Sequence, residues 1–496
     1  NLKSVKTILA KRGIVLNGLY FDIMVAGYLL NPSQPSFDAE GLALKYLDRI
    51  TPKGLSGQGY LNLITELKVV LEKELKEKKL FDLFEATEMP LTGVLAEMEL
   101  VGISLDSKLL LRLSKEVRKK TAALEKKIYA LSGSKFNINS PKQLRVILFD
   151  KLMLPVVKKT KTGPSTDEEV LNKLSARHEL PALLLDYRQL VKLKTTYIDV
   201  LPRIVDLSTG KVHTIFNQCA TETGRLSSSN PNLQNIPVKT DIGSRIREAI
   251  IPSGKGRLFL SCDYSQIELR ILAHLSGDKG LIRAFKEKGD IHKATASIIY
   301  SVKEAEVTEG MRDCAKRVNF GIIYGLTSFG LSRDLNIPVD EAQAFIDAYF
   351  MRYPGVKEYI EDQIDRAERD GFVTTILGRR RYVPEIRSKN ISIRQFAQRQ
   401  AVNTPIQGSA SDLIKLAMVS IHSEIQEKGL DSKMVLQIHD ELLFDVPDGE
   451  LFALANLAKK NMENVLSLSI PIVVDMKKGL NWLAMSVYPE TNLYTN

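Results

Sequence analysis

Cysteine and tryptophan are scarce in this sequence, and long apolar runs are missing. The 496 residues include 3 cysteines and 1 tryptophan, and the cysteines (Cys219, Cys262 and Cys314) lie far apart, without the spacing of a metal site. Such usage excludes a disulfide framework and fits a reducing compartment. No apolar run reaches transmembrane length and no basic-then-apolar leader opens the chain, so we expect neither a membrane protein nor a secretory signal.

Acidic residues are fewer than basic ones. The 69 lysines and arginines outweigh 59 aspartates and glutamates, which gives a net charge of +10 and a pI near 9.1. A basic chain favours a polyanionic partner, either nucleic acid or an anionic membrane surface, and nucleic acid is the better interpretation here because no membrane segment is evident. A chain of this length should fold as roughly two to four domains. It begins at Asn1 rather than at methionine, as expected of a fragment or a processed product.

The stretch Met434–Val446 contains two apolar runs, rich in strand formers, on either side of Asp440 and Glu441. This pattern predicts a tight β-hairpin with two carboxylates at its tip. Asp-Glu is a poor turn pair, because neither residue takes a positive φ as readily as Asn-Gly does. A turn that disregards turn chemistry is typical of a functional site, although an ordinary solvated acidic turn remains the alternative.

Asp263 has a matching context, at the end of the predicted strand Leu258–Cys262 and before the predicted helix Gln266–Leu275. Two carboxylates that come together repel each other unless a divalent cation lies between them. Mg²⁺ is typically held by one or two carboxylates and substrate phosphates, and two such ions about 4 Å apart can activate an attacking oxygen and stabilise a leaving one. The pair Asp263 and Asp440 in a basic chain therefore points to phosphoryl transfer on nucleic acid.

A third feature lies on the predicted helix Met311–Tyr324. Its residues Arg312, Lys316, Phe320 and Tyr324 recur every fourth position, so they share one slowly rotating face. Two cations followed by two aromatic rings make a poor core stripe but a good clamp, with charges for a triphosphate and rings for a base. A helix with a mixed surface is the alternative.

Other basic segments admit two interpretations. The predicted helix Leu105–Leu131, capped by Ser104 or Asp106, carries lysines and arginines that fit either a phosphate-facing stripe or, more commonly, a solvated face. Lys158–Gly163 is a basic loop suited to a nucleic-acid backbone, and Gly378–Arg380 predicts a hairpin with a basic tip.

Four segments, taken in order, resemble the motifs of family A DNA polymerases. They are Thr223-Gly224-Arg225, Asp263-Tyr264-Ser265-Gln266-Ile267-Glu268-Leu269-Arg270, the run from Arg312 to Gly325 with Lys316, Phe320 and Tyr324, and His439-Asp440-Glu441. The likeness extends from about Leu80 to Trp482 and is greatest to the large fragment of the bacterial members. It implies a multi-domain α+β fold, a right hand with palm, fingers and thumb behind a partial RNase H-like exonuclease remnant. The implied divisions are 1–64 (remnant), 65–215 (thumb), 216–275 (first part of the palm), 276–390 (fingers) and 391–496 (second part of the palm).

The resemblance also assigns roles near the carboxylates. Asp263 and Asp440, with the backbone carbonyl of Tyr264, would hold two Mg²⁺ ions, for which Mn²⁺ can substitute, and Glu441 would be an accessory carboxylate near the primer end. The primer 3′-hydroxyl would attack the α-phosphate of a deoxynucleoside triphosphate in line, and pyrophosphate would leave. Lys316 would also protonate the departing pyrophosphate.

Nucleotide and DNA contacts follow from the same motifs. Arg312, Lys316 and His292 resemble triphosphate ligands, and Glu268 resembles a steric gate that fills the space of a ribose 2′-hydroxyl. The remaining nucleotide-site residues are Phe320, Tyr324 and Gln266, and the minor-groove readers are Arg225, Arg399, Asn403, Gln407 and His439. Minor-groove acceptors are nearly the same for every correct base pair, which suits a sequence-independent enzyme. For Arg399, Asn403 and Gln407 a capped helix end is the alternative, because Pro405 interrupts them.

One departure from the family concerns proofreading. Asn1–Val5 and Tyr60–Ile64 occupy two exonuclease motifs, but Val5 and Ile64 stand where metal ligands should be, and the earlier motif is absent. We therefore expect a monomeric, template-directed DNA polymerase without 3′→5′ exonuclease activity, acting on primer-template DNA in the cytoplasm, at the nucleoid of a bacterium, with an organelle not excluded. A non-catalytic DNA-binding remnant and a single-subunit RNA polymerase are the alternatives; Glu268 argues against the second.

Overall fold

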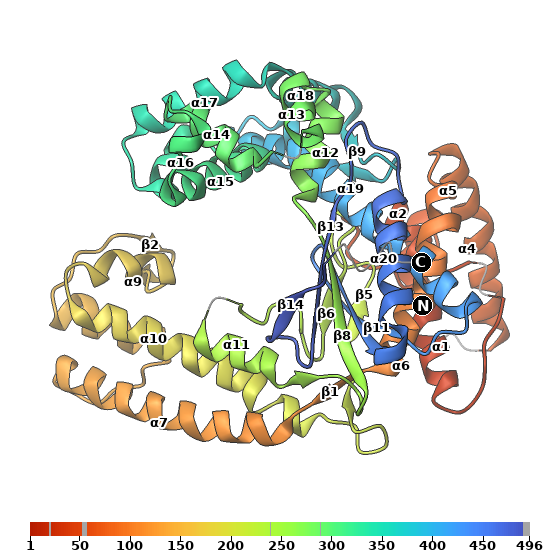
Figure 1. Cartoon of the computed structure of the whole chain (residues 1–496), viewed down its shortest axis with the longest axis horizontal. Helices are drawn as coiled ribbons and strands as arrows, with labels where there is room; N and C mark the ends of the chain where they lie inside the picture. The colour runs from red at the N-terminus through yellow and green to blue at the C-terminus, as the bar shows by residue number, and fades with distance from the viewer. Residues whose placement is uncertain (19–20, 52–56, 239, 288, 490–496) are drawn as a thin grey trace.

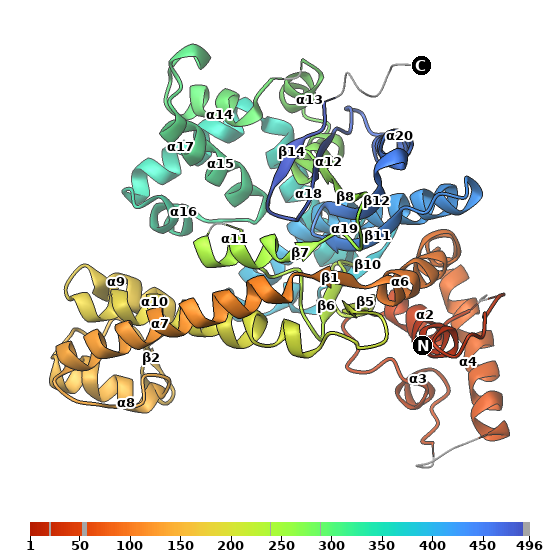
Figure 2. The same ribbon diagram turned by 60° about the horizontal axis from the view of Figure 1, so that its bottom comes forward.

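The computed structural model describes residues 1–18, 21–51, 57–238, 240–287 and 289–489. Figure 1 shows a central sheet with one helical group above it, a pair of long helices extending below, and a further group of helices around the N-terminus. Figure 2, turned about the horizontal axis, shows the two long helices projecting away from the sheet. The multi-domain α+β class expected from the sequence is confirmed.

The central sheet is antiparallel, and its inner strands are buried on both faces, whereas β13 alternates buried and exposed positions. Its strands β12 and β8 are continuous apolar runs, such as Leu442-Leu443-Phe444, because helices cover the sheet and leave few strand positions exposed. The sheet order is β11-β12-β8-β13-β14, with β8 (Arg257–Tyr264), β11 (Lys433–Ile438), β12 (Glu441–Pro447), β13 (Val474–Gly479) and β14 (Met485–Val487). The smaller sheets are β4-β1-β7 (Lys211–Val212, Ile103–Leu105, Ile250–Ile251) and β5-β6 (Ile215–Asn217, Ser227–Ser229).

The predicted hairpin is present, but its turn is shifted by one residue. His439 and Asp440 form the turn, and Glu441 already belongs to β12, where it pairs with Ile438. His439 takes the positive φ of 51° that the turn requires. Glu441 stays in the strand because it also pairs with Asp263 of β8 on the other side.

One long helix, α19, leads from the upper helical group to β11 of the sheet. The helix α19 runs without a break from Ile391 to Glu427, although Pro405 lies inside it. The capped helix end considered for this region is therefore wrong. The other helices here are α12 (Ile267–Ser276), α13 (Lys279–Lys286), α14 (Ile291–Ile299), α15 (Glu309–Ile323), α16 (Ser328–Leu335), α17 (Val339–Arg352), α18 (Pro354–Asp370) and α20 (Leu451–Asn464), with the hairpin β9-β10 (Phe372–Thr374, Arg380–Tyr382).

The helical arm below the sheet is built on α7 (Ser107–Ser132) and α10 (Glu179–Leu193), which lie antiparallel in Figure 1. The Asp106 carboxylate caps α7 by accepting a hydrogen bond from the backbone N–H of Leu109, and Gly133 ends the helix with a φ of 61°, as predicted. The far end of the arm has its own apolar core. Its smaller elements are α8 (Pro141–Arg145), α9 (Glu168–Ser175), α11 (Asp241–Glu248) and the hairpin β2-β3 (Lys159–Thr160, Gly163–Pro164).

The N-terminal helices form a separate packed group. The helix α4 (Gln58–Glu77) buries Leu63, Leu67, Leu71 and Leu75, which recur every fourth residue and pack with α2 and α3 in one apolar core. It therefore crosses the boundary expected at residue 64 and continues the N-terminal group rather than beginning the arm. The other members are α1 (Leu2–Ala10), α2 (Ile23–Leu30), α3 (Ala39–Tyr46), α5 (Phe81–Leu83) and α6 (Met89–Val101).

None of the helices in the described part of the chain combines the length and the apolar composition that crossing a bilayer requires.

Candidate active site

Two aspartates that are far apart in the sequence meet at one end of the central sheet. Glu441 of β12 pairs directly with Asp263 of β8, and the backbone N–H of Tyr264 donates to the carbonyl oxygen of Asp440 at 3.1 Å. Asp440 precedes Glu441, and Tyr264 follows Asp263. The strand pairing thus brings Asp263 and Asp440 to the same place, as the sequence predicted.

A further carboxylate joins them that the sequence analysis did not identify. Asp475 of β13 is the other direct cross-strand partner of Asp263, so Asp475, Asp263 and Glu441 stand in one row across three strands. Residues directly opposite in a sheet point to the same face. The Ser261 hydroxyl donates to Glu441 Oε1 at 2.6 Å. The row is formed by the register between the strands, which cannot be read from the sequence of any one strand.

The clustered carboxylates raise one another's proton affinity. Partial burial, with the charges of Glu441, Asp440 and Asp475, raises the pKa of Asp263 to about 7. Burial and the Glu268 carboxylate raise the pKa of Asp440 to about 6, although the Arg225 guanidinium opposes this. The Asp263 side chain is exposed, so water screens part of the repulsion. Such a site gains from binding a cation.

The donor atoms fit a hard divalent ion. Asp263 and Asp440 offer carboxylate oxygens, and Tyr264, the last residue of β8, offers a backbone carbonyl next to Asp263. Among the described residues, no group of three or more His, Cys, Asp or Glu side chains is arranged to hold a metal by itself. Ions at this site would therefore take ligands from a bound substrate, which is how Mg²⁺ is commonly held.

The helix α15 lines a cleft beside this cluster. Lys316, Phe320 and Tyr324 face a space of about 1160 Å³, whose opposite wall is formed by Glu169 and Lys173 of α9. Arg312 lies one turn before Lys316 and forms an ion pair with Asp290 (Nε to Oδ2, 2.7 Å). The four residues predicted to share a face therefore do lie in order along one helix, with Tyr324 at its C-terminal cap.

Across the same cleft the arm touches the upper helices. Arg333 of α16 forms an ion pair with Glu169 of α9 (Nη2 to Oε1, 2.7 Å). Both side chains are about half exposed, so this pair spans the mouth of the cleft rather than lying inside a core.

His292 is less accessible than expected. Only 2% of its surface is exposed, the Asn319 amide contacts its Nδ1 at 3.0 Å, and its ring centroid lies 6.1 Å from that of Phe320. Burial, helped by the nearby charges of Arg312 and Lys316 and opposed by Asp290, lowers its pKa to about 4. The imidazole is therefore neutral at physiological pH and packed behind the aromatic face in this conformation.

Glu268 is held from two sides. Its Oε1 accepts a bond from Arg225 Nη2 at 2.5 Å, and its Oε2 accepts a bond from the Tyr324 hydroxyl at 3.1 Å. Glu268 is buried in the first turn of α12, after Gln266 takes a left-handed conformation with φ of 53° at the helix cap. Burial and the Glu268 charge raise the pKa of Tyr324 to about 12, so its hydroxyl remains a donor.

Two groups of predicted minor-groove readers lie on different elements. Arg225 and His439 line a small pocket together with Asp440. Arg399, Asn403 and Gln407 are spaced by four residues on the unbroken α19, which places them on one helix face. The Asn403 Oδ1 is buried and has no hydrogen-bond partner within the described residues.

The hairpin predicted at Gly378–Arg380 is present as β9-β10, and the contact predicted between the Lys158–Gly163 loop and nucleic acid stays a prediction. At the expected basic tip, Arg379 is buried and forms ion pairs with Glu88 and Asp412, whereas Arg380 is half-buried and donates to the Lys78 carbonyl oxygen at 2.9 Å. Lys158 lies beside Asp167, with Nζ 2.8 Å from Oδ2, which offsets part of that loop's charge.

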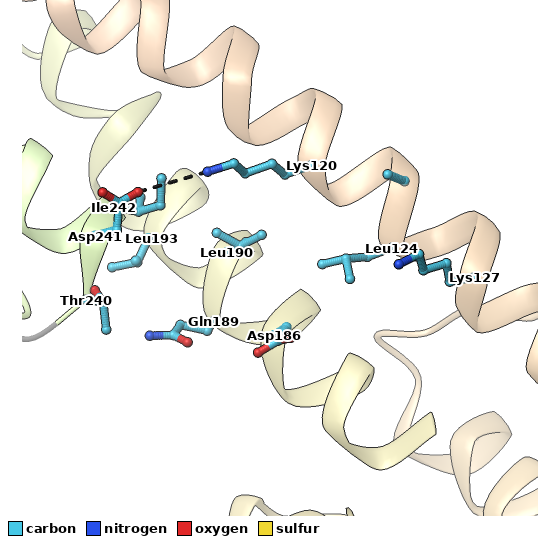
Figure 3. Close-up of a pocket in the computed structure, with 11 residues that line it drawn as sticks. Lys120, Leu124, Lys127, Asp186, Gln189, Leu190, Leu193, Thr240, Asp241 and Ile242 are labelled. Carbon is cyan, nitrogen blue, oxygen red and sulfur yellow. Dashed lines mark ion pairs between the residues drawn. The ribbon is translucent and has the colours of Figure 1, made fainter. Parts of the chain in front are cut away.

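Between α7, α10 and α11 the arm contains a groove of about 430 Å³. Figure 3 shows Lys120 and Lys127 of α7 along one side of it, opposite Gln189 of α10. Lys120 is 4.0 Å from Asp241 of α11 and 2.9 Å from Glu116. The groove therefore has basic side chains from α7 at its rim.

Comparison with known proteins places this geometry in a family. The family model of DNA polymerase family A matches residues 107–484. The chain belongs to DNA polymerase family A. This membership confirms the resemblance drawn from the four motifs.

Individual family A relatives are similar over nearly the whole chain. The chain is 45% identical to DNA polymerase I of Geobacillus stearothermophilus over 490 residues, covering 95% of this chain and 56% of that protein. It is 45% identical to the thermostable DNA polymerase I of Thermus aquaticus over 498 residues, covering 98% of this chain and 58% of that protein. The chain thus spans a little over half the length of these curated relatives.

A solved family A structure has the same fold. It is the POL domain of Pol1 from M. smegmatis in complex with DNA primer-template and dNTP, with a TM-score of 0.94 and 41% sequence identity. The match covers 98% of this chain and 85% of that one.

Proposed function

We propose that this chain is a template-directed DNA polymerase that adds deoxynucleotides to a primer 3′-hydroxyl and does not proofread. The observation that carries the proposal is the meeting of Asp263 and Asp440 beside a cleft lined by Lys316, Phe320 and Tyr324, in a chain of family A. The solved relative that binds primer-template DNA and dNTP supports the same substrates for this chain.

Asp263 and Asp440, with the carbonyl of Tyr264, would hold two divalent ions, Mg²⁺ or in its place Mn²⁺. When bound, such ions activate the attacking oxygen and neutralise charge on the leaving group. Glu441, fixed by Ser261, would remain beside the primer end as an accessory carboxylate.

The side chains of α15 act on the nucleotide. Arg312 and Lys316 would neutralise the triphosphate, and Lys316, which is exposed in the cleft, would pass a proton to the leaving pyrophosphate. Phe320 would stack on the incoming nucleotide, Tyr324 would close over the templating position, and Gln266 would border the site. His292 would contact the triphosphate only after leaving its buried position.

Glu268 would exclude ribonucleotides. Its carboxylate is held by Arg225 and Tyr324, so it cannot move aside freely for a 2′-hydroxyl. The minor-groove readers would be Arg225, His439, Arg399, Asn403 and Gln407, and the unpaired Asn403 Oδ1 is an acceptor that a DNA contact could satisfy. We further propose that the chain acts as a monomer in the bacterial cytoplasm, at the nucleoid.

Primer extension with Asp440→Asn tests the proposal. We expect extension to fall by about a thousandfold or more, the scale on which removal of an essential charge acts, while primer-template binding measured by anisotropy persists. The unaltered protein must extend a primer only when the template-matched deoxynucleotide is present. Binding without extension by the unaltered protein would favour the non-catalytic alternative, and preferential use of ribonucleotides would favour an RNA polymerase.

A further inference from the structure

The loop Thr221–Arg225 carries the guanidinium that holds Glu268. Arg225 Nη2 contacts Glu268 Oε1 at 2.5 Å, and the backbone carbonyl of Arg225 accepts a hydrogen bond from the Thr221 hydroxyl at 2.8 Å. The loop therefore closes on itself through Thr221. The position of Thr221 therefore constrains the Arg225 backbone, and with it the side chain that meets Glu268.

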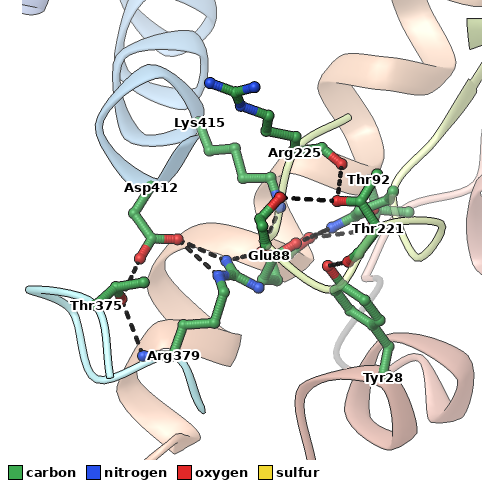
Figure 4. A network of polar contacts seen from close by, with 11 residues as sticks. Tyr28, Glu88, Thr92, Thr221, Arg225, Thr375, Arg379, Asp412 and Lys415 are labelled. Atoms are coloured by element: carbon green, nitrogen blue, oxygen red, sulfur yellow. Dashed lines mark hydrogen bonds and ion pairs between the residues drawn. The ribbon is translucent and has the colours of Figure 1, made fainter. Parts of the chain in front are cut away.

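A tyrosine from the N-terminal helices fixes Thr221. The Tyr28 hydroxyl donates to the Thr221 carbonyl oxygen at 2.6 Å, across 193 positions of sequence. Tyr28 lies on α2, is 1% exposed, and packs edge-on against the ring of Phe37. Figure 4 shows its ring rising from α2 so that only the hydroxyl reaches the loop.

A buried ionic cluster forms the wall behind the same loop. Arg379 is paired with Glu88 and Asp412, and Lys415 Nζ lies 2.7 Å from Glu88 Oε1. Two acids and two bases balance, and although burial raises the pKa of Glu88, the charges of Lys415 and Arg379 outweigh it and bring the pKa to about 2. Figure 4 shows the cluster joining Asp412 and Lys415 of α19, the β9-β10 hairpin and Glu88.

The cluster touches the loop directly at Gly224. This residue has a φ of 85°, and a Cβ there would lie 2.7 Å from Arg379 Nε, so a side chain would displace the guanidinium. Arg381 adds a further tether through its ion pair with Glu222 (Nη2 to Oε2, 2.5 Å). The loop is thus clamped between the Arg379 cluster on one side and Tyr28 on the other.

We propose that Tyr28 is a positioning residue of the polymerase site, which acts through Thr221 and Arg225 on the sugar discrimination of Glu268. This inference rests on the proposed gating role of Glu268. It gives the N-terminal helices a part in nucleotide selection even though their exonuclease motifs lack metal ligands. Tyr28 touches no substrate; it holds the loop from which Arg225 reaches the gate.

The test compares Tyr28→Phe with Tyr46→Phe. Tyr28→Phe removes one hydroxyl and keeps the packed ring, and Tyr46→Phe makes the same change in the same helical group, where the ring faces Lys45. The measurement is the ratio of kcat/KM for a deoxynucleotide to that for the matching ribonucleotide, with kcat and KM resolved, alongside the melting temperature. We expect Tyr28→Phe to lower this ratio about threefold to tenfold, the scale of one lost hydrogen bond, and Tyr46→Phe to leave it unchanged.

An unchanged ratio in Tyr28→Phe, or an equal loss in both variants, would overturn the inference. Glu268→Ala separates this from failure of the proposed function: if it leaves the ratio unaltered, the gate itself is misassigned. Should Tyr28→Phe melt at a markedly lower temperature, Thr221→Val and Thr221→Ser carry the test. Only the serine variant keeps the hydroxyl that binds the Arg225 carbonyl, so it alone should retain the ratio of the unaltered protein. Equal ratios in Thr221→Val and Thr221→Ser would contradict the proposal.

Discussion

At the scale of single residues, the acidic row at the sheet end lowers the stability of the metal-free protein. Asp475, Asp263 and Glu441 are direct neighbours across three strands, and Asp440 adjoins them. Without a cation these charges repel, and the pKa of Asp263 rises from an ordinary 3.8 to about 7. The arrangement therefore makes the metal-free protein sensitive to pH in a defined direction.

The direction in which stability changes with pH follows from proton binding. Because the pKa of Asp263 is raised in the folded state, the folded protein binds more protons than the unfolded chain between about pH 4 and pH 7, so stability falls as pH rises through this window. We predict that at pH 8 without divalent ions Asp263→Asn melts at a higher temperature than the unaltered protein, by a few degrees. Scanning calorimetry at pH 8 and pH 4.5 measures this, and the difference should shrink at the lower pH.

Asp448→Asn is the matched control, because Asp448 is an exposed aspartate on a short turn outside the acidic row. It should not change the melting temperature at either pH. Added Mg²⁺ should raise the melting temperature of the unaltered protein at pH 8 and leave that of Asp263→Asn nearly unchanged. A lower melting temperature for Asp263→Asn at pH 8 would contradict the repulsion argument.

At the scale of elements, a substitution on the arm helix α7 can test whether the basic face of this helix contacts DNA. Lys127 lines the groove between α7, α10 and α11. If it contacts a phosphate, Lys127→Ala should reduce the slope of log K for primer-template binding against log salt by about 1, because one fewer counterion is released. Fluorescence anisotropy at several salt concentrations measures the slope. Lys73 is an exposed lysine on α4, so Lys73→Ala should leave the slope unchanged. Equal slopes in the unaltered protein and in both variants would show that Lys127 is solvated and contacts no phosphate.

Elements with local signals were predictable, and elements that depend on distant contacts were not. The aligned residues of α15 and the end caps of α7 follow from spacing along one helix, and the β11-β12 hairpin follows from its two apolar runs. The continuity of α19 was missed because proline usually breaks a helix. Here the residues around Pro405 are buried and α19 packs against α12, α18 and β9, and this packing offsets the lost backbone bond.

In the site, too, features with a local sequence signal were predictable and features that depend on distant contacts were not. The motif residues could be identified from the sequence, whereas Asp475 is brought in by strand register and Arg379 is neutralised by Glu88, 291 positions away. Neither relation leaves a trace in the surrounding residues. The shift of the hairpin turn to His439 has a similar origin, because Glu441 is retained in β12 by its pairing with β8.

At the scale of the whole molecule, the N-terminal helices are expected to have lost one activity. Val5 and Ile64 have no side-chain oxygen to hold a cation. We predict that purified protein with Mg²⁺ and no nucleotides leaves a labelled single-stranded primer at full length over hours, as resolved on a denaturing gel. Asp440→Asn is the control: shortening that persists in this variant would locate a working nuclease outside the polymerase site and contradict the prediction.

The ion pair between Glu169 and Arg333 has a consequence for how the proposed duplex substrate would enter the cleft. Together with the sheet and the two helical groups, it closes a ring around the cleft in this conformation. An exposed pair of this kind contributes only about 0.2–1 kcal/mol, so thermal motion opens the ring readily. If the cleft takes a DNA duplex as proposed, a covalently closed template would need no free end to be loaded and could enter at any point along a circle.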